Sequence, residues 1–261
     1  MGRVIAVTNQ KGGVGKTTTS VNLAASLAAT RRRVLLIDLD PQGNATMGCG
    51  IDKRSLAASA YDLLIDGRRV ASVAVQLPNQ GFDLVPSNGD LTGAEVALLS
   101  VDGREQRLRR ALEPVVADYD YVLIDCPPAL NMLTVNALCA AHSVIIPMQC
   151  EYYALEGLST LIEIIERIRK VQNPVLQIEG LLRTMFDARN NLASQVSAEL
   201  LTHFGAKVYR TTIPRNVRLA EAPSHGLPAL YYDKTSSGAI AYLALAGEML
   251  RRDDAHNGAA A

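Results

Sequence analysis

The fold is decided by a stretch near the start of the chain, which reads Asn9-Gln10-Lys11-Gly12-Gly13-Val14-Gly15-Lys16-Thr17-Thr18-Thr19. It follows the apolar run Val4–Thr8, which predicts a strand, and leads into the alanine-rich run Thr17–Thr30, which predicts a helix. Glycines let the backbone wrap closely around phosphate groups, and the start of a helix adds partial positive charge. The stretch therefore predicts a phosphate-binding loop.

Two side chains of this loop have a predicted chemistry: Lys16 reaches the β- and γ-phosphates, and Thr17 places its hydroxyl on Mg²⁺. The common pattern G-x-x-x-x-G-K-[ST] needs glycine at position 10, where this chain has Gln10, and an additional lysine stands at Lys11. The loop is therefore of the deviant Walker A type. We expect it to bind ATP and Mg²⁺, the nucleotide being held by Lys11, Gly12, Gly13, Val14, Gly15, Lys16, Thr17 and Thr18.

Short β-branched runs alternate with helical stretches along the chain. The predicted strands are Val4–Thr8, Val34–Leu39, Phe82–Pro86, Tyr121–Asp125, Ser143–Pro147, Gln177–Thr184 and Val208–Ile213. The predicted helices are Thr17–Thr30, Arg104–Ala117, Asn131–Ala141, Leu155–Val171, Leu192–Phe204 and Ser237–Arg252. Several strands are apolar on both faces, as strands covered by helices on both sides must be. The alternation predicts an α/β fold, a doubly wound and mostly parallel sheet flanked by helices, of the P-loop NTPase class.

Length and composition fit one large domain. The 261 residues are 48% hydrophobic and 20% charged, and no apolar run reaches the length of a membrane span. Lys and Arg together number 26, as do Asp and Glu, so a net charge of +0 gives no overall attraction to nucleic acid or membranes. We expect a single P-loop ATPase domain over residues 1–252 and a disordered tail over residues 253–261.

The N-terminus and the cysteines favour a cytoplasmic protein. The first residues meet a segment rich in lysine and glycine rather than the cleavage site of a signal peptide. The four cysteines are spaced 77, 13 and 11 residues apart, which matches no metal-binding or redox pattern, so we expect free thiols at Cys49, Cys126, Cys139 and Cys150.

Acidic residues stand at the carboxyl ends of two predicted strands. Asp38 and Asp40 project to the same side, next to the crevice where open α/β sheets bind ligands, so both are candidates for Mg²⁺ or water. Pro41 stops the strand and leaves Asp40 as the more mobile residue. Asp125 ends an apolar strand as a Walker B acid does, which predicts contact with Mg²⁺ through water. The predicted metal site is Thr17, Asp40 and Asp125.

Motifs along nearly the whole chain resemble the ParA/Soj family of chromosome- and plasmid-partition ATPases. The similar segments are Arg3–Cys49, Val122–Pro128, Gln149–Gly157 and Thr211–Gly226. The resemblance implies that Asp40 positions the attacking water, with Asp38 as structural support, and that Lys11 reaches across a dimer interface to the partner's phosphates. Lys11, Lys16 and Asp40 are then the catalytic residues of an ATP-bound homodimer. Pro214 and Asn216 match the positions that hold adenine in the family.

A basic region lies in the neutral chain between Arg183 and Arg218, where six basic residues against two acidic ones give a local charge of +4. Such a region can bind DNA phosphates without reading the sequence. The family resemblance implies that Arg189 and Arg218 contact nonspecific double-stranded DNA and that a ParB-type centromere-binding protein stimulates a slow ATPase. It also implies a nucleoid-associated protein that segregates a chromosome or a plasmid.

Two other functions share the deviant loop. A MinD-like ATPase that positions cell division needs a basic, amphipathic C-terminal helix to bind membranes, and the small and polar residues after Arg252 do not predict one, so we expect no membrane partner. A metabolic or iron–sulfur enzyme needs cysteines placed at a subunit interface, and the cysteine spacing does not support that.

Overall fold

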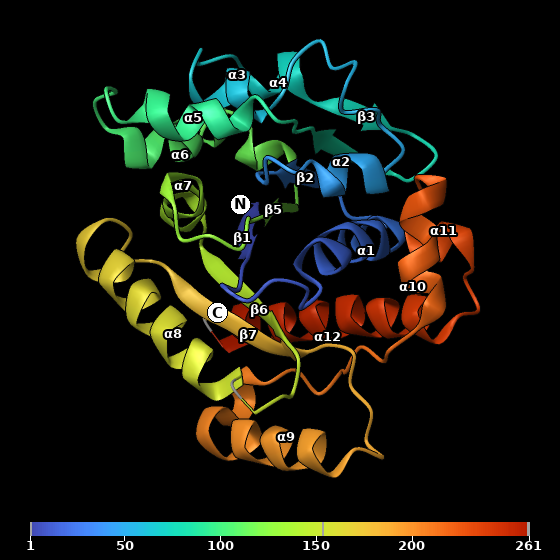
Figure 1. Ribbon diagram of the computed structural model, residues 1–261. Helices are drawn as coiled ribbons and strands as arrows, with labels where there is room; N and C mark the ends of the chain where they lie inside the picture. Colours follow the sequence, from blue (N-terminus) through green and yellow to red (C-terminus); the bar gives the residue numbers. More distant parts are fainter. Residues whose placement is uncertain (1, 153, 260–261) are drawn as a thin grey trace.

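The computed structural model describes residues 2–152 and 154–259 and is built around one seven-stranded sheet (Figure 1). The strand order is β3-β4-β2-β5-β1-β6-β7, and every neighbouring pair is parallel except β3 with β4. The strands are β1 (Arg3–Val7), β2 (Val34–Asp38), β3 (Val75–Leu77), β4 (Phe82–Val85), β5 (Tyr121–Asp125), β6 (Ser143–Met148) and β7 (Gln177–Arg183). The predicted doubly wound, mostly parallel sheet is confirmed.

Helices cover both faces of the sheet. They are α1 (Lys16–Ala29), α2 (Asn44–Gly48), α3 (Ala60–Leu64), α4 (Val70–Val73), α5 (Leu91–Leu98), α6 (Arg107–Leu112), α7 (Met132–Ala140), α8 (Ala154–Val171), α9 (Asn191–Phe204), α10 (Val217–Glu221), α11 (Ala229–Tyr232) and α12 (Ser237–Ala259). Within the described part of the chain, none of them has the length and hydropathy needed to cross a membrane.

The two faces of β1 belong to two separate hydrophobic cores. Val4 and Ala6 pack with α3 to α9, whereas Ile5 and Val7 pack with α1, α2 and α10 to α12 (Figure 1). Successive side chains of a strand point to opposite faces, so a strand buried on both sides must be apolar at every position. This is why the runs at β1 and β2 lack polar alternation.

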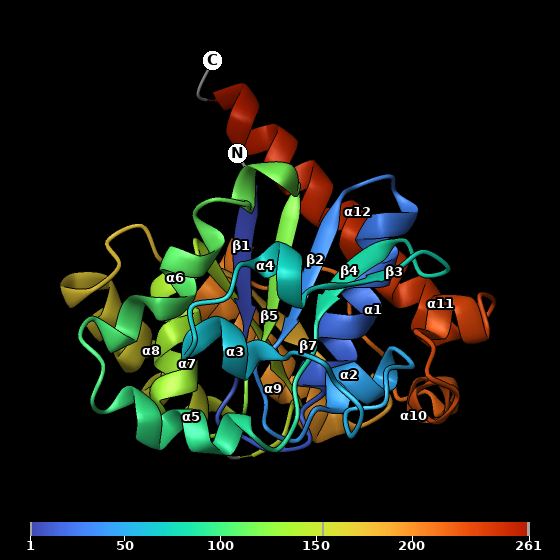
Figure 2. The same ribbon diagram turned by 90° about the horizontal axis from the view of Figure 1, so that it is seen from above.

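The strand register brings the acidic strand ends together. Val7 of β1 pairs with Asp125 of β5, and Asp125 pairs with Asp38 of β2. The loop that follows β1 starts from the same edge. Figure 2 shows α2 and α5 at this carboxyl edge, at the opposite end of the sheet from the start of β1. The candidate site therefore lies where the central strands end, as open α/β sheets require.

One predicted strand was wrong, and one strand was missed. Residues 208–213 form only an isolated bridge between Val208 and Leu181, because the amides of Arg210 and Thr211 donate to the Glu248 carboxylate of α12, each at 2.9 Å. Amides used in this way cannot pair with another strand. The missed strand, β3, has only three residues and pairs antiparallel with β4 at the sheet edge.

The C-terminal residues differ from the expected tail. α12 runs to Ala259, so residues 253–259 are helical where a disordered tail was predicted. Asp253 bonds with Arg3 and with the Tyr121 hydroxyl, and these contacts hold this part of the helix against the amino ends of β1 and β5. Residues 260–261 lie outside the described part of the chain. The single domain over residues 1–252 stays a prediction.

Candidate functional site

The loop between β1 and α1 forms an open cradle. Gly13 and Gly15 have φ angles of +73° and +87°, in the left-handed region that side chains rarely adopt. A Cβ atom added at Gly12 or Gly13 would meet no atom within 4 Å, so packing does not explain these glycines. The loop leaves space in front of its backbone and leads directly into the start of α1, an arrangement suited to phosphate groups.

Lys16 places a buried ammonium group inside this cradle. Its side chain is nearly enclosed, and its Nζ atom donates to the carbonyl oxygen of Lys11 at 3.1 Å. Burial lowers the pKa of Lys16, while the nearby carboxylate of Asp125 acts in the opposite direction. A cation that is buried with one carbonyl partner would gain strongly from phosphate oxygens.

Asp125 presents one unused carboxylate oxygen. Its Oδ1 atom accepts from the Ser20 hydroxyl at 2.8 Å, and its buried Oδ2 atom has no hydrogen-bond partner within the described residues. Burial, followed by the charge of Asp38, raises the pKa of Asp125. The Thr17 side chain lies beside the carboxylate and acts to lower its pKa. An unpartnered acidic oxygen next to the loop fits a cation or its water shell, since Mg²⁺ usually takes only one or two protein carboxylates.

Asp38 and Asp40 have different surroundings. Asp38 is fully buried and accepts from the Thr46 amide at 2.8 Å, the Thr46 hydroxyl at 2.7 Å and the Asp40 amide at 3.2 Å. Within residues 2–152 and 154–259, the Asp40 carboxylate accepts one hydrogen bond, from the Gln42 amide to Oδ1 at 2.9 Å. Its backbone carbonyl is held by the Ser87 hydroxyl at 2.8 Å. Both carboxylate oxygens of Asp38 thus accept hydrogen bonds from neighbouring residues, whereas Asp40 keeps one carboxylate oxygen available.

Lys11 points away from the cradle of its own chain. Its Nζ atom forms an ion pair with Glu151, and both side chains are about half exposed, at 46% and 50%. The other end of the residue is fixed, because the Lys11 amide donates to the Asn9 side chain at 3.0 Å. The ammonium group therefore lies at the surface, where a second protein chain can reach it.

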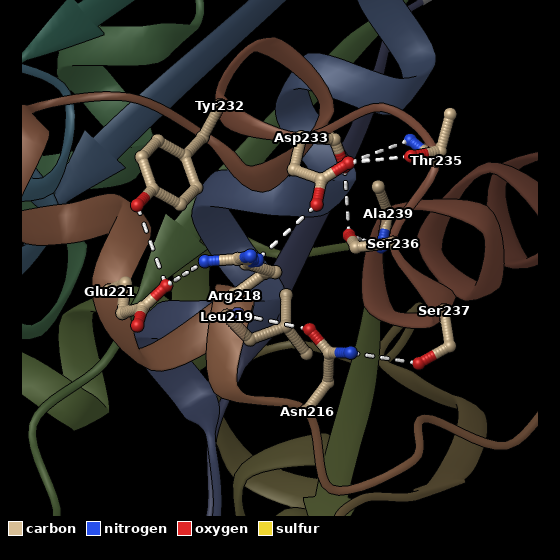
Figure 3. Close-up of polar contacts among 10 residues, drawn as sticks. All are labelled: Asn216, Arg218, Leu219, Glu221, Tyr232, Asp233, Thr235, Ser236, Ser237 and Ala239. Atoms are coloured by element: carbon tan, nitrogen blue, oxygen red, sulfur yellow. Dashed lines mark hydrogen bonds and ion pairs between the residues drawn. The ribbon is translucent and has the colours of Figure 1, made fainter.

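A cavity of about 190 Å³ continues from the cradle toward α10. Gly15 and Thr18 line one side, and Pro214 and Asn216 line another. The Asn216 side chain is already engaged, because it accepts from the Leu219 amide at 3.3 Å and donates to Ser237 at 2.8 Å (Figure 3). Of the two residues predicted to hold adenine, Pro214 is thus the one whose side chain is available to a ligand in this cavity.

The two arginines predicted to bind DNA are on the surface, and each has an acidic partner. Arg189 is 91% exposed and bonds with Asp187 at 2.8 Å, which lowers the pKa of that carboxyl to about 2. Arg218 lies between Glu221, at 2.7 Å, and Asp233, at 3.3 Å (Figure 3). The charge available to phosphates at this surface is thus smaller than a count along the sequence indicates.

Arg183 does not belong to the basic surface, although it lies in the basic region of the sequence. It is only 7% exposed, and its guanidinium group donates to Ser197 and to the backbone carbonyls of Tyr209 and Arg210. This arginine is structural, because it satisfies carbonyl groups of the segment that follows α9. Removing it from the count lowers the local charge of the basic region.

The structure adds site residues that the motifs did not identify. Ser20 lies one helical turn after Lys16, and that spacing is the signal that could have found it. Thr46 and Ser87 connect Asp38 to Asp40, since the Ser87 amide donates to the Thr46 hydroxyl at 2.8 Å. Glu151 lies within the similar segment Gln149–Gly157, but the resemblance assigns it no role. Thr184 directly follows β7, and no local pattern indicates its contact with the loop.

The four cysteines are free thiols, as predicted, and all are buried: Cys49, Cys126, Cys139 and Cys150. None is at the surface, where a cluster shared between subunits would need its ligands. In the described part of the chain, no group of three or more His, Cys, Asp or Glu side chains is arranged to hold a metal ion by itself. A cation bound at Asp125 would therefore need phosphate oxygens as further ligands.

Comparisons with known sequences match nearly the full chain. A family model described as an AAA domain matches residues 2–178. The chain is 55% identical over 249 residues to the sporulation initiation inhibitor protein Soj of Bacillus subtilis, covering 95% of this chain and 98% of the relative. It is 51% identical over 253 residues to the chromosome partitioning protein ParA of Caulobacter vibrioides, covering 96% and 95%.

Solved structures confirm the fold class. Cobyrinic acid a,c-diamide synthase of Mycobacterium smegmatis, determined with bound ADP and magnesium, has a TM-score of 0.85 at 39% identity and covers 97% of this chain and 96% of that chain. The cell division ATPase MinD of Pyrococcus furiosus has a TM-score of 0.79 at 23% identity, covering 96% and 99%. The second likeness concerns the fold alone.

Proposed function

Because this chain belongs to the ParA/Soj family of chromosome-partitioning ATPases, we propose that it hydrolyses ATP as a nucleotide-linked dimer that binds DNA and drives segregation. The observation that carries the proposal is the combination at one sheet edge of an open glycine cradle, the buried Lys16 and the unpartnered oxygen of Asp125. The full-length match to Soj and ParA sequences supports it.

ATP and Mg²⁺ fit the residues present. In our proposal the backbone from Gly12 to Thr18 surrounds the phosphates, Lys16 bonds with the β- and γ-phosphates, and Pro214 packs against the adenine. Thr17, Asp40 and Asp125 would hold Mg²⁺ and its water shell. When bound, Mg²⁺ neutralises charge on the phosphate oxygens.

Asp40 is the residue we assign to the attacking water. Its carboxylate has an available oxygen, and its backbone is fixed by Ser87, so a water molecule held there would be oriented toward the phosphates. Asp38 supports Asp40 and does not contact the water itself. It accepts hydrogen bonds from Thr46 and from the Asp40 amide, and these bonds fix the backbone that carries Asp40.

Lys11 is the residue we assign to dimerisation. In one chain its ammonium group is paired with Glu151 at the surface, and an exposed pair of this kind contributes only about 0–1 kcal/mol. The phosphates of a nucleotide in a second chain carry more negative charge than one carboxylate. ATP bound between two chains would therefore join them, and hydrolysis would release them.

Replacing Lys11 by alanine is expected to leave ATP binding within about threefold and to weaken ATP-dependent dimerisation by about tenfold or more, as removal of a charge-assisted hydrogen bond implies. Sedimentation velocity with a non-hydrolysable ATP analogue, beside equilibrium nucleotide binding, measures both. Glu151→Gln is the matched control, because it breaks the ion pair within the chain and should retain dimerisation. Joint loss of nucleotide binding and dimerisation in Lys11→Ala would show that Lys11 acts within its own chain.

We assign DNA binding to Arg189 and Arg218, whose side chains are exposed. Arg189 is the last residue of the segment Thr184–Arg189, and Arg218 is the last residue of the segment Pro214–Arg218. A single chain of formal net charge +0 presents only a small local excess of positive charge. Two chains held together by ATP would present two such surfaces at once, and the second contact would form at a high effective concentration. We therefore expect DNA binding to depend on ATP.

Replacing Arg189 and Arg218 by alanine is expected to weaken binding equally for unrelated duplexes. The magnitude of the slope of log K against log salt should fall by about 0.9 for each DNA phosphate that the variant no longer neutralises. Fluorescence titration of two duplexes at several salt concentrations measures this. Arg54→Ala is the control, since Arg54 is 82% exposed and paired with Asp52 in the same two-residue spacing as Arg189 with Asp187.

A gel shift with ATP, with ADP and without nucleotide tests the proposed function as a whole. We expect retardation of nonspecific DNA with ATP only, and binding that is indifferent to the nucleotide would contradict the proposal. A ParB-type protein is the proposed stimulator of a slow ATPase, and association with the nucleoid follows from DNA binding. Addition of such a partner should raise the rate of phosphate release in the presence of DNA.

A further inference from the structure

The segment Thr184–Arg189, which follows β7, is fixed to the phosphate loop at its first residue. The Thr184 side chain is 2% exposed, and its hydroxyl donates to the backbone carbonyl of Val14 at 2.8 Å. The Thr184 amide donates to the backbone carbonyl of Met148, in the neighbouring strand β6, at 2.9 Å. A buried hydroxyl with this geometry joins the segment to the loop that would surround the phosphates.

The second residue of the segment is strained and is also held from the loop side. Met185 has a φ angle of +49°, a left-handed conformation that is costly for a residue with a side chain. Gln149 lies between the two parts, because its Nε2 atom donates to the Gly13 carbonyl at 3.4 Å and to the sulfur of Met185. Such strain persists only where surrounding contacts maintain it.

The same two residues form part of the cavity that continues from the cradle. Thr184 and Met185 line it together with Gly15 of the loop and Pro214 of the facing segment. The Phe186 amide then donates to the Ile213 carbonyl at 2.9 Å, which ties the two segments together. One segment continues to Arg189 and the other to Arg218, so a ligand in this cavity contacts the starts of both.

We propose that Thr184 is a positioning residue that transmits nucleotide binding to Arg189. A nucleotide that fills the cavity fixes the loop, and the Thr184 hydroxyl extends this constraint to Met185 and the residues after it. Arg189 is then ordered before DNA arrives, so that DNA binding loses less conformational entropy. This inference rests on the proposed function, because it concerns how the ATP site and the DNA contact are coupled.

Thr184→Val and Thr184→Ser form the test pair, since valine keeps the shape without the hydroxyl and serine keeps the hydroxyl. Amide hydrogen exchange of residues 185–190 is measured with and without a non-hydrolysable ATP analogue, at concentrations that saturate each variant. We expect the analogue to slow exchange in the wild type and in Thr184→Ser, and to have little effect in Thr184→Val. The gain in DNA affinity caused by the analogue should fall by about fivefold in Thr184→Val, the effect of one hydrogen bond.

Analytical ultracentrifugation of the same samples separates this effect from impaired dimerisation. The inference would be overturned if the analogue slowed amide exchange equally in the valine and serine variants. It would also be overturned if the analogue left amide exchange in the wild type unchanged. If the exchange pattern holds but the wild type does not bind DNA, the proposed function fails while the link stands. Should Thr184→Val not fold, Thr184→Ala replaces it, because alanine also removes the hydroxyl that donates to the Val14 carbonyl. Its exchange should then respond less to the analogue, and an unchanged response would overturn the link.

Discussion

Replacing Lys16 by alanine is expected to lower the affinity for ATP by about 100-fold or more. Lys16 is the buried ammonium of the cradle, and among the described residues its hydrogen-bond partner is a backbone carbonyl at 3.1 Å. Removing a charge-assisted contact to phosphate in a site shielded from water costs roughly 3 kcal/mol, which corresponds to this change. Isothermal titration calorimetry with ATP and Mg²⁺ measures the affinity directly.

The control for this result is Lys170→Ala, which removes an exposed lysine at the end of α8. It should bind ATP like the wild type. Thermal unfolding of Lys16→Ala without nucleotide should remain close to that of the wild type, because the burial that lowers the pKa of Lys16 also makes its charge unfavourable in the empty cradle. An ATP affinity within threefold of the wild type would remove Lys16 from the site.

Replacing Asp40 by alanine is expected to lower the rate of ATP hydrolysis by about 100-fold or more while leaving the ATP-bound dimer intact. The reason is that a positioned acid or base contributes about 10²–10⁴-fold to a rate but little to binding of the ground state. Phosphate release under single-turnover conditions gives the rate, and size-exclusion chromatography with ATP gives the oligomeric state. Asp40→Ala protein that binds ATP but stays monomeric would refute the assignment.

Asp38→Ala supplies the comparison, because the two aspartates stand two residues apart with different partners. Removing Asp38 leaves the Thr46 amide and hydroxyl without their acceptor, both in a fully buried position. We expect a decrease of roughly 3 kcal/mol in the unfolding free energy, against a much smaller change for Asp40→Ala. Urea denaturation of both variants measures the difference, and equal stabilities would show that Asp38 is not a support.

The core of the candidate site follows from local sequence. A strand, a glycine loop and a helix that starts at Lys16 are specified within a few residues of one another. Strands apolar on both faces must be central in a parallel sheet, and the ends of such strands meet at one edge. The sequence therefore predicts Asp38 and Asp125 near the loop, and the register pairs them directly.

Other polar partners were decided by the tertiary structure alone. Residues 208–213 have the composition of a strand, but two of their backbone amides donate to the Glu248 carboxylate instead of to a neighbouring strand. Arg218 adds a full positive charge to the basic region of the sequence, yet it is paired with Asp233, fifteen positions further along the chain. Sequence patterns report which faces are apolar and where the backbone can turn, because these are local properties. Which distant carboxylate, carbonyl or hydroxyl meets a given polar group depends on how the elements pack, and this is why the link from Thr184 to Val14 could be found only in the folded chain.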